Sequence, residues 1–206
     1  MKKNKTSKSW IHKQNRDLFF KKSKIQGYRS RSAFKLIEMN NKFKFLNKST
    51  NLLDLGSSPG GWSQVAREKI FKGKILATDI KNMEKIENVK FFKEDFLNPL
   101  TGKKILNFFE KKIDVVVSDM AANTSGNKNL DSYRTGELCL KAMDLSLRIL
   151  AKDGVFLSKL FMGAIFVEIN NKANKYFNKV IKYKPLSSRK ESKEIYIYCK
   201  GISNTL

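Results

Sequence analysis

Five polar residues stand where predicted strands of this chain end, and their types could do chemistry together. Asp54, Asp79, Asp95, Asp119 and Lys159 each close or directly follow a short apolar run. On an open parallel sheet, ligands bind beyond the carboxyl ends of the strands. Carboxylates in that place suit a cationic ligand better than a phosphate, and a lysine among them could orient a hydroxyl group or take its proton. Each acid alone could instead cap the helix that follows, but that interpretation explains the whole set poorly.

The segment Asp54-Leu-Gly-Ser-Ser-Pro-Gly-Gly-Trp62 follows an apolar run and precedes a helical pattern. A strand, a glycine-rich turn and a helix start in that order form a nucleotide-type pocket, because glycine lets the backbone approach a ligand and the helix start offers free N–H groups. The glycines at 56, 60 and 61 are not spaced as Gly-x-Gly-x-x-Gly, which argues against a dinucleotide. A nicotinamide-dependent oxidoreductase is therefore a disfavoured alternative.

The acids around this turn favour S-adenosylmethionine as the cofactor. Asp79, after the second strand, is placed to accept hydrogen bonds from ribose hydroxyls, and Asp95, after the third, could accept one from an adenine amino group. Asp54 would lie near the methionine end, where an ammonium or sulfonium group favours a carboxylate. We therefore expect Asp54, Gly56, Asp79 and Asp95 at the cofactor site.

Strand-like and helix-like patterns alternate along the chain and predict a Rossmann-like α/β fold with a seven-stranded, mostly parallel sheet. The last two strands lack an intervening helix, so we expect them to form a C-terminal antiparallel hairpin. No linker divides residues 26–206, which are predicted to form one domain. The expected strands are 52–55, 74–80, 89–94, 113–119, 155–160, 179–183 and 194–199, and the expected helices are 30–43, one from about 61, one within 98–112, 131–152 and 164–177.

The net charge of +23, from 42 Lys and Arg against 19 Asp and Glu, suggests a polyanionic partner, most simply nucleic acid. A general drift of composition toward Lys, Asn and Ile could account for part of this excess. It explains the distribution less well, because residues 1–35 hold twelve basic residues and only one acid, Asp17. We therefore predict a basic N-terminal arm over residues 1–25 that contacts RNA, with Arg189 and Lys190 beside it.

Few features point to a metal, a membrane or an oxidising compartment. Cys139 and Cys199 are far apart in the chain and are expected as buried core residues in a reducing environment. The single histidine, His12, lies in the basic arm, which argues against a zinc site or a His-dependent triad. No apolar run approaches the roughly 18 residues that a membrane helix needs. We expect a cytoplasmic monomer without a metal.

Several segments, in order and at compatible spacing from about Gln26 to Gly201, make the chain resemble the RrmJ/FtsJ family of S-adenosylmethionine-dependent RNA 2′-O-ribose methyltransferases. Each segment alone is a modest signal, and together they are a strong one. The chain departs from the family at Ala122, where proline is common. The segments are Tyr28-Arg-Ser-Arg-Ser-Ala-Phe-Lys35-Leu, Asp54 to Gln64, Ser118-Asp-Met-Ala-Ala-Asn123 with Ser125-Gly126, Lys159, Lys184 to Arg189, and Ser192 to Tyr196.

The resemblance implies a reaction and assigns residues to it. Within the family the chain is most similar to the bacterial enzymes that methylate a uridine of large-subunit (23S) ribosomal RNA, so we expect that substrate, on the assembled large subunit. A transfer RNA or messenger cap ribose is the alternative substrate, and an RNA-binding module without catalysis is a further alternative. The implied catalytic tetrad is Lys35, Asp119, Lys159 and Glu194, and the implied cofactor residues are Gly60, Trp62, Asp79, Asp95 and Asp119.

In the expected mechanism, a ribose 2′-hydroxyl attacks an activated methyl group in line. Lys159 would orient that hydroxyl and take its proton, or, if it stays charged, it would stabilise the developing alkoxide; the sequence leaves both roles open. Asp119 would hold Lys159 in place, and Lys35 and Glu194 would set the local field.

Overall fold

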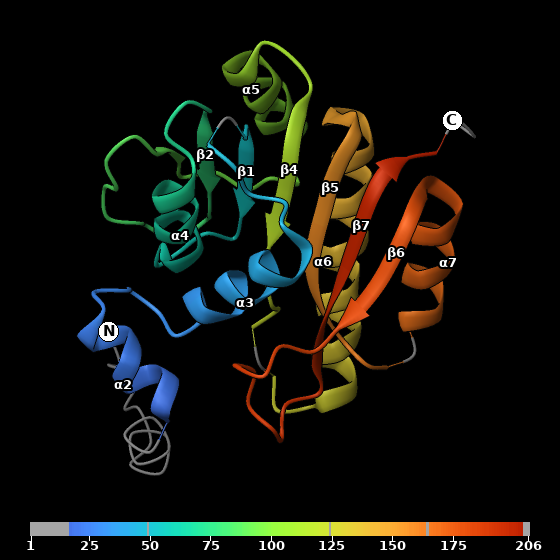
Figure 1. Cartoon of the computed structure of the whole chain (residues 1–206). Helices are drawn as coiled ribbons and strands as arrows, with labels where there is room; N and C mark the ends of the chain where they lie inside the picture. The colour runs from blue at the N-terminus through green and yellow to red at the C-terminus, as the bar shows by residue number, and fades with distance from the viewer. Residues whose placement is uncertain (1–16, 49, 124, 164, 204–206) are drawn as a thin grey trace, which may run out of the picture.

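The computed structural model describes residues 17–48, 50–123, 125–163 and 165–203, and a single seven-stranded sheet forms its centre (Figure 1). The strands are β1 (Leu52–Leu55), β2 (Ile75–Thr78), β3 (Lys90–Phe92), β4 (Ile113–Ser118), β5 (Leu150–Phe161), β6 (Phe177–Tyr183) and β7 (Glu194–Ile202). They lie in the order β3-β2-β1-β4-β5-β7-β6. β7 runs antiparallel to β5 and to β6, and the other neighbours are parallel. The predicted sheet and its C-terminal antiparallel pair are therefore confirmed.

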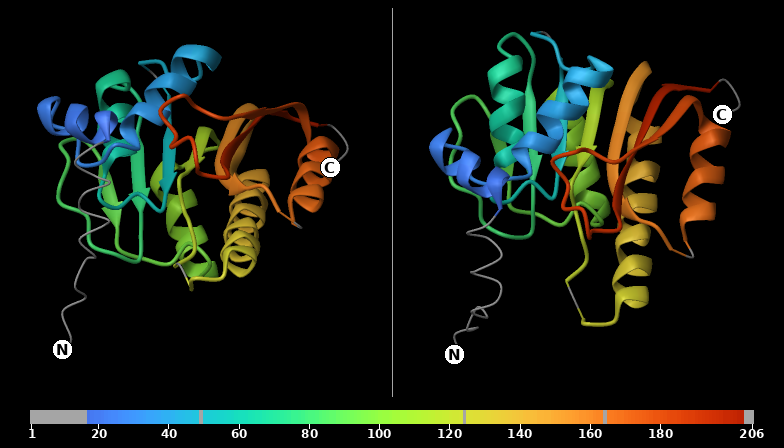
Figure 2. Two further views of the ribbon diagram at one scale, coloured as in Figure 1. Left: turned by 90° about the horizontal axis from the view of Figure 1, so that it is seen from below. Right: turned by 60° about the horizontal axis from the view of Figure 1, so that its bottom comes forward.

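Five helices cover the two faces of this sheet, and α2 (Leu18–Ile25) packs against α3. The five are α3 (Ala33–Phe43), α4 (Gly61–Lys69), α5 (Pro99–Phe109), α6 (Lys128–Ile149) and α7 (Phe166–Tyr176). α3 and α4 pack on one face, and α5, α6 and α7 pack on the other (Figures 1 and 2). Because side chains alternate along a strand, β4 serves both layers: Val116 joins the core under α6, whereas Val115 and Val117 join the core under α3.

Several element boundaries differ from the sequence prediction, and at the starts of β5 and β6 buried side chains outweigh the local turn signals. The helix expected to reach residue 152 ends at Ile149, and β5 begins at once with Leu150, which is buried and pairs with Ile113 of β4. Asp153 and Gly154, which directly follow the predicted helix, lie inside β5, where the register to β4 shifts. Phe177, also buried, starts β6 earlier than predicted.

Residues 18–25 form α2, a helix that the weak pattern of the basic arm did not predict. Asp17 is its N-cap and accepts hydrogen bonds from two backbone N–H groups of the first turn, at 3.1 and 3.2 Å, which stabilises a helix start. Asp17 also pairs with Arg31 and, at 3.3 Å, with Arg189. The single acid of the N-terminal region therefore ties α2 to the rest of the protein. The remainder of the predicted arm, residues 1–16 with His12, lies outside the described residues.

The two cysteines are free thiols in the core, as predicted. Cys139 lies on α6 and Cys199 on β7, and both are buried. Burial raises the pKa of the Cys139 thiol to about 12, so this thiol is uncharged and unreactive at neutral pH.

The longest described helix, α6, carries charged residues along its length, and none of the described helices combines the length and apolarity that a bilayer crossing needs.

Candidate active site

The turn between β1 and α4 takes a backbone conformation that glycine adopts far more easily than other residues. Gly56 and Gly60 have φ angles of +71° and +113°. A Cβ atom on Gly56 would lie 2.1 Å from Cγ of Met120, so the turn and the loop after β4 leave no room for a side chain there. The N–H groups of Gly56 and Ser57 donate to the carbonyl of Thr78, at 2.9 and 3.2 Å, which fixes the turn against the end of β2.

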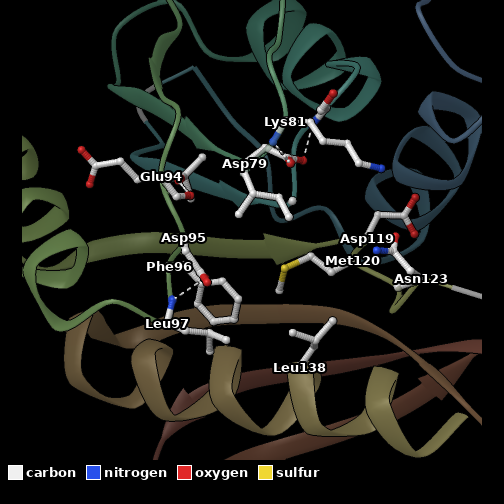
Figure 3. A pocket seen from close by; sticks show the side chains of 15 residues that line it. Asp79, Lys81, Glu94, Asp95, Phe96, Leu97, Asp119, Met120, Asn123 and Leu138 are labelled. Carbon is white, nitrogen blue, oxygen red and sulfur yellow. Dashed lines mark hydrogen bonds between the residues drawn. The ribbon is translucent and has the colours of Figure 1, made fainter. Parts of the chain in front are cut away.

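A cavity of about 320 Å³ opens beside this turn, at the carboxyl ends of β1, β2 and β4 (Figure 3). Three of the predicted cofactor acids, Asp79, Asp95 and Asp119, line it, and so does Gly56. Carboxylates combined with an apolar lining suit a ligand that carries both positive charge and an aromatic group. The apolar lining comes from Ile80, Phe96, Leu97, Met120, Ala121 and Leu138.

Asp79 and Asp95 also shape the loops that form the cavity. Asp79 accepts hydrogen bonds from the backbone N–H groups of Ser58 (2.9 Å) and Lys81 (2.8 Å), and so it joins the glycine-rich turn to the loop after β2. Asp95 accepts one from the N–H of Leu97 at 2.9 Å. Because each carboxylate oxygen has two lone pairs, both acids keep the capacity to accept hydrogen bonds from a ligand.

Three residues expected at the cofactor site, Asp54, Gly60 and Trp62, lie outside the cavity lining. Asp54 is buried within β1. Gly60 is the N-cap of α4. The Trp62 side chain is buried in the core under α3 and α4, and its Nε1–H donates to the carbonyl of Ser32 at 2.8 Å. Their side chains therefore build the frame of the turn, and any contact of Gly60 or Trp62 with a ligand would come from the backbone.

Asp54 is a buried acid whose ordinary ionisation is disfavoured. Its Oδ2 accepts a hydrogen bond of 2.6 Å from the hydroxyl of Ser63 on α4. Burial raises the pKa of Asp54 to about 7; the Ser63 hydrogen bond acts to lower it, and the charges of Asp119 and Asp79 raise it further. Asp54 therefore joins β1 to the start of α4 and takes up a proton near neutral pH.

The four residues of the predicted tetrad come together as two ion pairs. Lys35 Nζ lies 2.8 Å from Glu194 Oε1, and Lys159 Nζ lies 3.1 Å from Asp119 Oδ1. Lys159 Nζ also donates to the main-chain carbonyl of Asp119 at 2.6 Å. These four side chains are between 10% and 17% exposed. They come from α3, the loop after β4, β5 and β7, so the fold assembles them from four separate elements.

Tyr196 of β7 connects the two ion pairs, and sequence reasoning assigned it no role. Its hydroxyl donates to Asp119 Oδ1 at 2.6 Å, the oxygen that also faces Lys159. The Lys35 ammonium lies 5.6 Å from the centre of the Tyr196 ring, a favourable cation–π distance. Tyr196 follows Glu194 by two residues on a strand, so both side chains project on the same face. That spacing is the signal that could have identified it.

The charges of the cluster keep Asp119 ionised. Burial acts to raise its pKa, but the ammonium groups of Lys159 and Lys35 and the hydrogen bond from Tyr196 more than offset this, so its pKa lies below the ordinary value. Burial, followed by the charges of Asp119 and Glu194, raises the pKa of Tyr196 well above its usual value. The tyrosine therefore stays protonated and remains a donor to Asp119.

Comparison with known protein families identifies the group to which this architecture belongs. A family model described as FtsJ-like methyltransferase matches residues 28–202. The chain belongs to the FtsJ-like methyltransferase family. A relative from Pelagibacter ubique, named Ribosomal RNA large subunit methyltransferase E, is 48% identical over 200 residues, which cover 97% of this chain and 98% of the relative. The family resemblance seen in the sequence motifs is confirmed, and the protein is a methyltransferase.

Solved structures described as methyltransferases share the fold. A candidate ribosomal RNA methyltransferase from Plasmodium falciparum superposes with a TM-score of 0.77 at 33% sequence identity, over 85% of this chain and 98% of that one. A candidate methyltransferase from Streptococcus mutans, solved in complex with SAH, superposes with a TM-score of 0.50 at 15% identity, over 80% of this chain and 96% of that one. The second likeness concerns the fold alone.

Ala122, the position at which the sequence resemblance led us to expect proline, makes a bond in the structure that proline could not make. The backbone N–H of Ala122 donates to the hydroxyl of Thr135 on α6 at 3.1 Å, whereas proline has no N–H. The next residue, Asn123, lines the cavity.

In the part of the chain that the structure describes, no three His, Cys, Asp or Glu side chains gather in a way that could hold a metal ion.

Proposed function

We propose that this FtsJ-like methyltransferase transfers a methyl group from S-adenosylmethionine to the ribose 2′-hydroxyl of a uridine in large-subunit (23S) ribosomal RNA, on the assembled large subunit. The observation that carries the proposal is the pair of coupled ion pairs, Lys35 with Glu194 and Lys159 with Asp119, beside an acid-lined cavity. The name of the Pelagibacter relative supports the ribosomal substrate. We further propose that the enzyme acts in the cytoplasm, as a monomer and without a metal.

The residues at the cavity fit S-adenosylmethionine, whose positive sulfur supplies a methyl group already activated for transfer. We propose that Asp79 binds the ribose hydroxyls, that Asp95 binds the adenine amino group, and that Gly56 and Gly60 admit the methionine part close to the backbone. Asp119 would border the same site, since it lines the cavity. The Streptococcus mutans protein of the same fold, solved in complex with SAH, supports a cofactor of this class.

Asp54 and Trp62 contribute to this site in the proposal without lining the cavity. Asp54 holds the start of α4 through its hydrogen bond with Ser63, so it sets where the helix N-terminus points. Trp62 holds the same helix through its bond to the Ser32 carbonyl and its burial. Both would keep the backbone N–H groups of the turn directed at the cofactor carboxylate.

Lys159 is the proposed partner of the attacking 2′-hydroxyl. As an ammonium group, it would orient the hydroxyl and stabilise the negative charge that develops on the attacking oxygen. As a neutral amine, it would orient the hydroxyl and accept its proton. Lys159 Nζ forms a 3.1 Å ion pair with the carboxylate of Asp119 and donates a 2.6 Å hydrogen bond to the main-chain carbonyl of Asp119, so Asp119 holds Lys159 in place. Lys35 and Glu194 neutralise each other at 2.8 Å and would shape the wall against which the ribose lies.

The RNA is proposed to lie across the N-terminal arm and the neighbouring loop. In this proposal residues 1–25 form a basic arm and residues 26–206 one methyltransferase domain. α2, the described part of the arm, carries Lys21, Lys22 and Lys24, and its cap contacts Arg189 of the loop after β6. Basic side chains grouped in this way bind phosphates and supply affinity with little base readout.

The deciding experiment incubates the protein with methyl-labelled S-adenosylmethionine and, in parallel, large ribosomal subunits, free 23S ribosomal RNA and transfer RNA. The labelled nucleotide is then mapped. Label on a uridine ribose of the assembled subunit supports the proposal in full, and label on the free RNA alone corrects the form of the substrate. Label on transfer RNA favours the alternative substrate. Label on a base, or none on any RNA, overturns the proposed function.

A further inference from the structure

The loop between β6 and β7, residues 184–193, lies along one side of α3, and its contacts with that helix are polar. The two views of Figure 2 show this loop, in red, beside α3, in blue. On α3, Glu38 accepts hydrogen bonds from the loop, and Lys35 pairs with Glu194 at the end of the loop. Positions 35 and 38 are three apart and fall on one face of the helix. In the turn before α3, an Arg31 guanidinium N–H donates to the Ser187 carbonyl.

Both carboxylate oxygens of Glu38 are fully engaged by this loop and the strand before it. Oε1 accepts from the Tyr183 hydroxyl at 2.6 Å and from the Leu186 N–H at 2.7 Å. Oε2 accepts from the N–H and the hydroxyl of Ser187, both at 3.0 Å. Burial acts to raise the pKa of Glu38, but these four bonds more than offset it and the pKa is lowered. The side chain is therefore an ionised anchor at neutral pH.

Hydrogen bonds within the 184–193 loop connect the part that Glu38 holds to the rest of the loop. The N–H of Ser188 donates to the Pro185 carbonyl at 3.0 Å, and the N–H of Ser192 donates to the Arg189 carbonyl at 3.1 Å. The Lys184 ammonium donates to the Ser192 carbonyl at 2.6 Å. Displacing the segment at 186–187 would therefore carry Arg189 and the start of β7 with it.

We propose that Glu38 is a positioning residue for methyl transfer: it holds the 184–193 loop on α3, so that Glu194 meets Lys35 and Arg189 stays beside the substrate. This inference rests on the proposed function, because it takes Lys35 and Glu194 as part of the reacting site. Lys35 lies one turn before Glu38, so a single rigid helix sets both ends of the loop. A small displacement of a positioning group can cost on the order of 100-fold in rate.

The anchor needs a carboxylate rather than only a polar side chain. Glutamine has the same shape, but it offers one acceptor oxygen and places an NH₂ group against donors of the loop. Two of the four bonds of Glu38 would then be lost or reversed. We therefore expect Glu38→Gln to fall between wild type and Glu38→Ala in every measurement.

The test compares Glu38→Ala and Glu38→Gln with Glu168→Gln, a control at an exposed glutamate on α7. Single-turnover methyl transfer is measured at saturating cofactor and RNA, at a temperature where circular dichroism shows each variant folded. Glu38→Ala is expected to lower this rate by about 10-fold or more, with Glu38→Gln intermediate. The cofactor Kd is expected to stay within about twofold, because no residue of the 184–193 loop lines the cavity. The control keeps both values.

Two further measurements separate positioning from general stability. Hydrogen exchange at the Leu186 and Ser187 amides should speed up in both Glu38 variants and not in the control. In a Glu194→Ala background, adding Glu38→Ala should lower the single-turnover rate by less than about twofold, because the two residues act through one pathway. A wild-type rate in Glu38→Ala, unchanged loop exchange, or full additivity with Glu194→Ala would each overturn the inference.

If the proposed function is wrong, the methylation rates and the loop exchange rates together give a different pattern. Wild type and every variant then methylate no RNA, while loop exchange still responds to Glu38. In that outcome the anchoring contact stands and its role in methyl transfer is overturned. A separate variant, Lys159→Ala, tests the proposed partner of the hydroxyl. If Lys159→Ala keeps the wild-type rate, that partner is wrong, and the Glu38 inference is still decided by the rates and loop exchange of the Glu38 variants.

Discussion

The hydroxyl of Tyr196 and the carboxylate of Asp119 are joined by a hydrogen bond of 2.6 Å that links β7 to the loop after β4 across the intervening β5. The oxygen that accepts this bond also lies 3.1 Å from Lys159 Nζ. Because Tyr196 and Lys159 are opposite residues in the β5–β7 ladder, one backbone register sets both distances. A carboxylate held from two sides keeps the Lys159 ammonium in one orientation, which the proposed reaction requires.

Tyr196→Phe should slow methyl transfer and destabilise the protein, because it removes this bond and keeps the ring. We expect the free energy of unfolding to fall by about 1 to 3 kcal/mol, as for a buried bond to a charged acceptor, and the single-turnover rate to fall by about 10-fold. Chemical denaturation and single-turnover kinetics measure the two effects. Tyr198→Phe, on the same face of β7, is the matched control. Equal rates for both variants would remove Tyr196 from the proposed site.

Lys159 variants should separate a proton acceptor from a fixed positive charge. Lys159→Ala is expected to lower single-turnover transfer by about 100-fold or more. The cofactor Kd should change by less than about threefold, because Lys159 does not line the cavity. Arginine keeps the charge but cannot lose a proton in a protein. A partly active Lys159→Arg enzyme therefore supports stabilisation of the alkoxide, and an inactive one that binds cofactor normally supports a base. Wild-type transfer by Lys159→Ala would refute both roles.

The buried carboxyl of Asp54 should make the cofactor-free protein less stable as the pH rises. Its pKa is raised from 3.8 to about 7 in the folded state, so between these values the folded protein binds more protons than the unfolded chain. The free energy of unfolding contributed by Asp54 is then highest below the unfolded pKa and declines as the pH rises toward about 7, by an amount on the order of a few kcal/mol.

Asp54→Asn provides the comparison, since it removes the titrating group and keeps the side-chain shape. The stability of the variant relative to wild type should increase from about pH 5 and level off above about pH 7. Urea denaturation at several pH values measures this difference, and taking a difference cancels the contributions of groups that both proteins share. A difference that stays flat over this range would show that Asp54 is ionised throughout.

The parts of the site that lie on parallel strands could be predicted from the sequence. Asp119 directly follows the apolar strand β4, and Lys159 lies near the end of the parallel strand β5, two residues before Phe161. The carboxyl ends of parallel strands meet at one edge of a sheet. The two-residue spacing from Glu194 could have placed Tyr196 on the same face of the last strand. Its contact with Asp119 could not be predicted, because that contact depends on the register of the antiparallel β7 against β5.

Long-range polar contacts account for the other features that the sequence did not reveal. Glu38 has the sequence context of an ordinary glutamate on a helix, yet its partners lie 145 to 149 residues further along the chain. α2 has a weak apolar pattern, and its cap residue Asp17 pairs with Arg31 and with the distant Arg189. Such pairs are set by the tertiary fold, and the spacing of neighbouring residues carries no trace of them.

Removing residues 1–16 should weaken RNA binding and leave cofactor binding intact. The deletion takes away six basic residues and no acid, so RNA affinity should fall and its dependence on salt should become shallower, by about 0.7 to 0.9 in the log–log slope per lost phosphate contact. Filter binding across a salt series measures this, and calorimetry measures the cofactor Kd. A full-length variant with glutamine at the six basic positions is the control for chain length. Equal loss of RNA and cofactor binding would indicate that these residues are structural.

Gly56→Ala should damage the cofactor site through Met120. The new Cβ would lie 2.1 Å from Cγ of Met120, so the flexible methionine must move, and Met120 lines the cavity. The positive φ of +71° adds roughly 1 to 2 kcal/mol of backbone strain for any residue with a Cβ. We expect the free energy of unfolding to fall by at least this strain and the cofactor Kd to rise by about 10-fold or more.

The double variant Gly56→Ala with Met120→Ala separates the two causes. Shortening Met120 removes the collision and leaves the φ strain, so cofactor affinity should recover toward that of Met120→Ala alone while the stability deficit from strain persists. Calorimetric titration with S-adenosylhomocysteine and urea denaturation report on the two quantities separately. If Gly56→Ala binds this ligand as tightly as wild type, the turn after β1 does not border the ligand. If the double variant recovers no affinity, the backbone of the turn, and not the displaced methionine, determines how closely the ligand can approach.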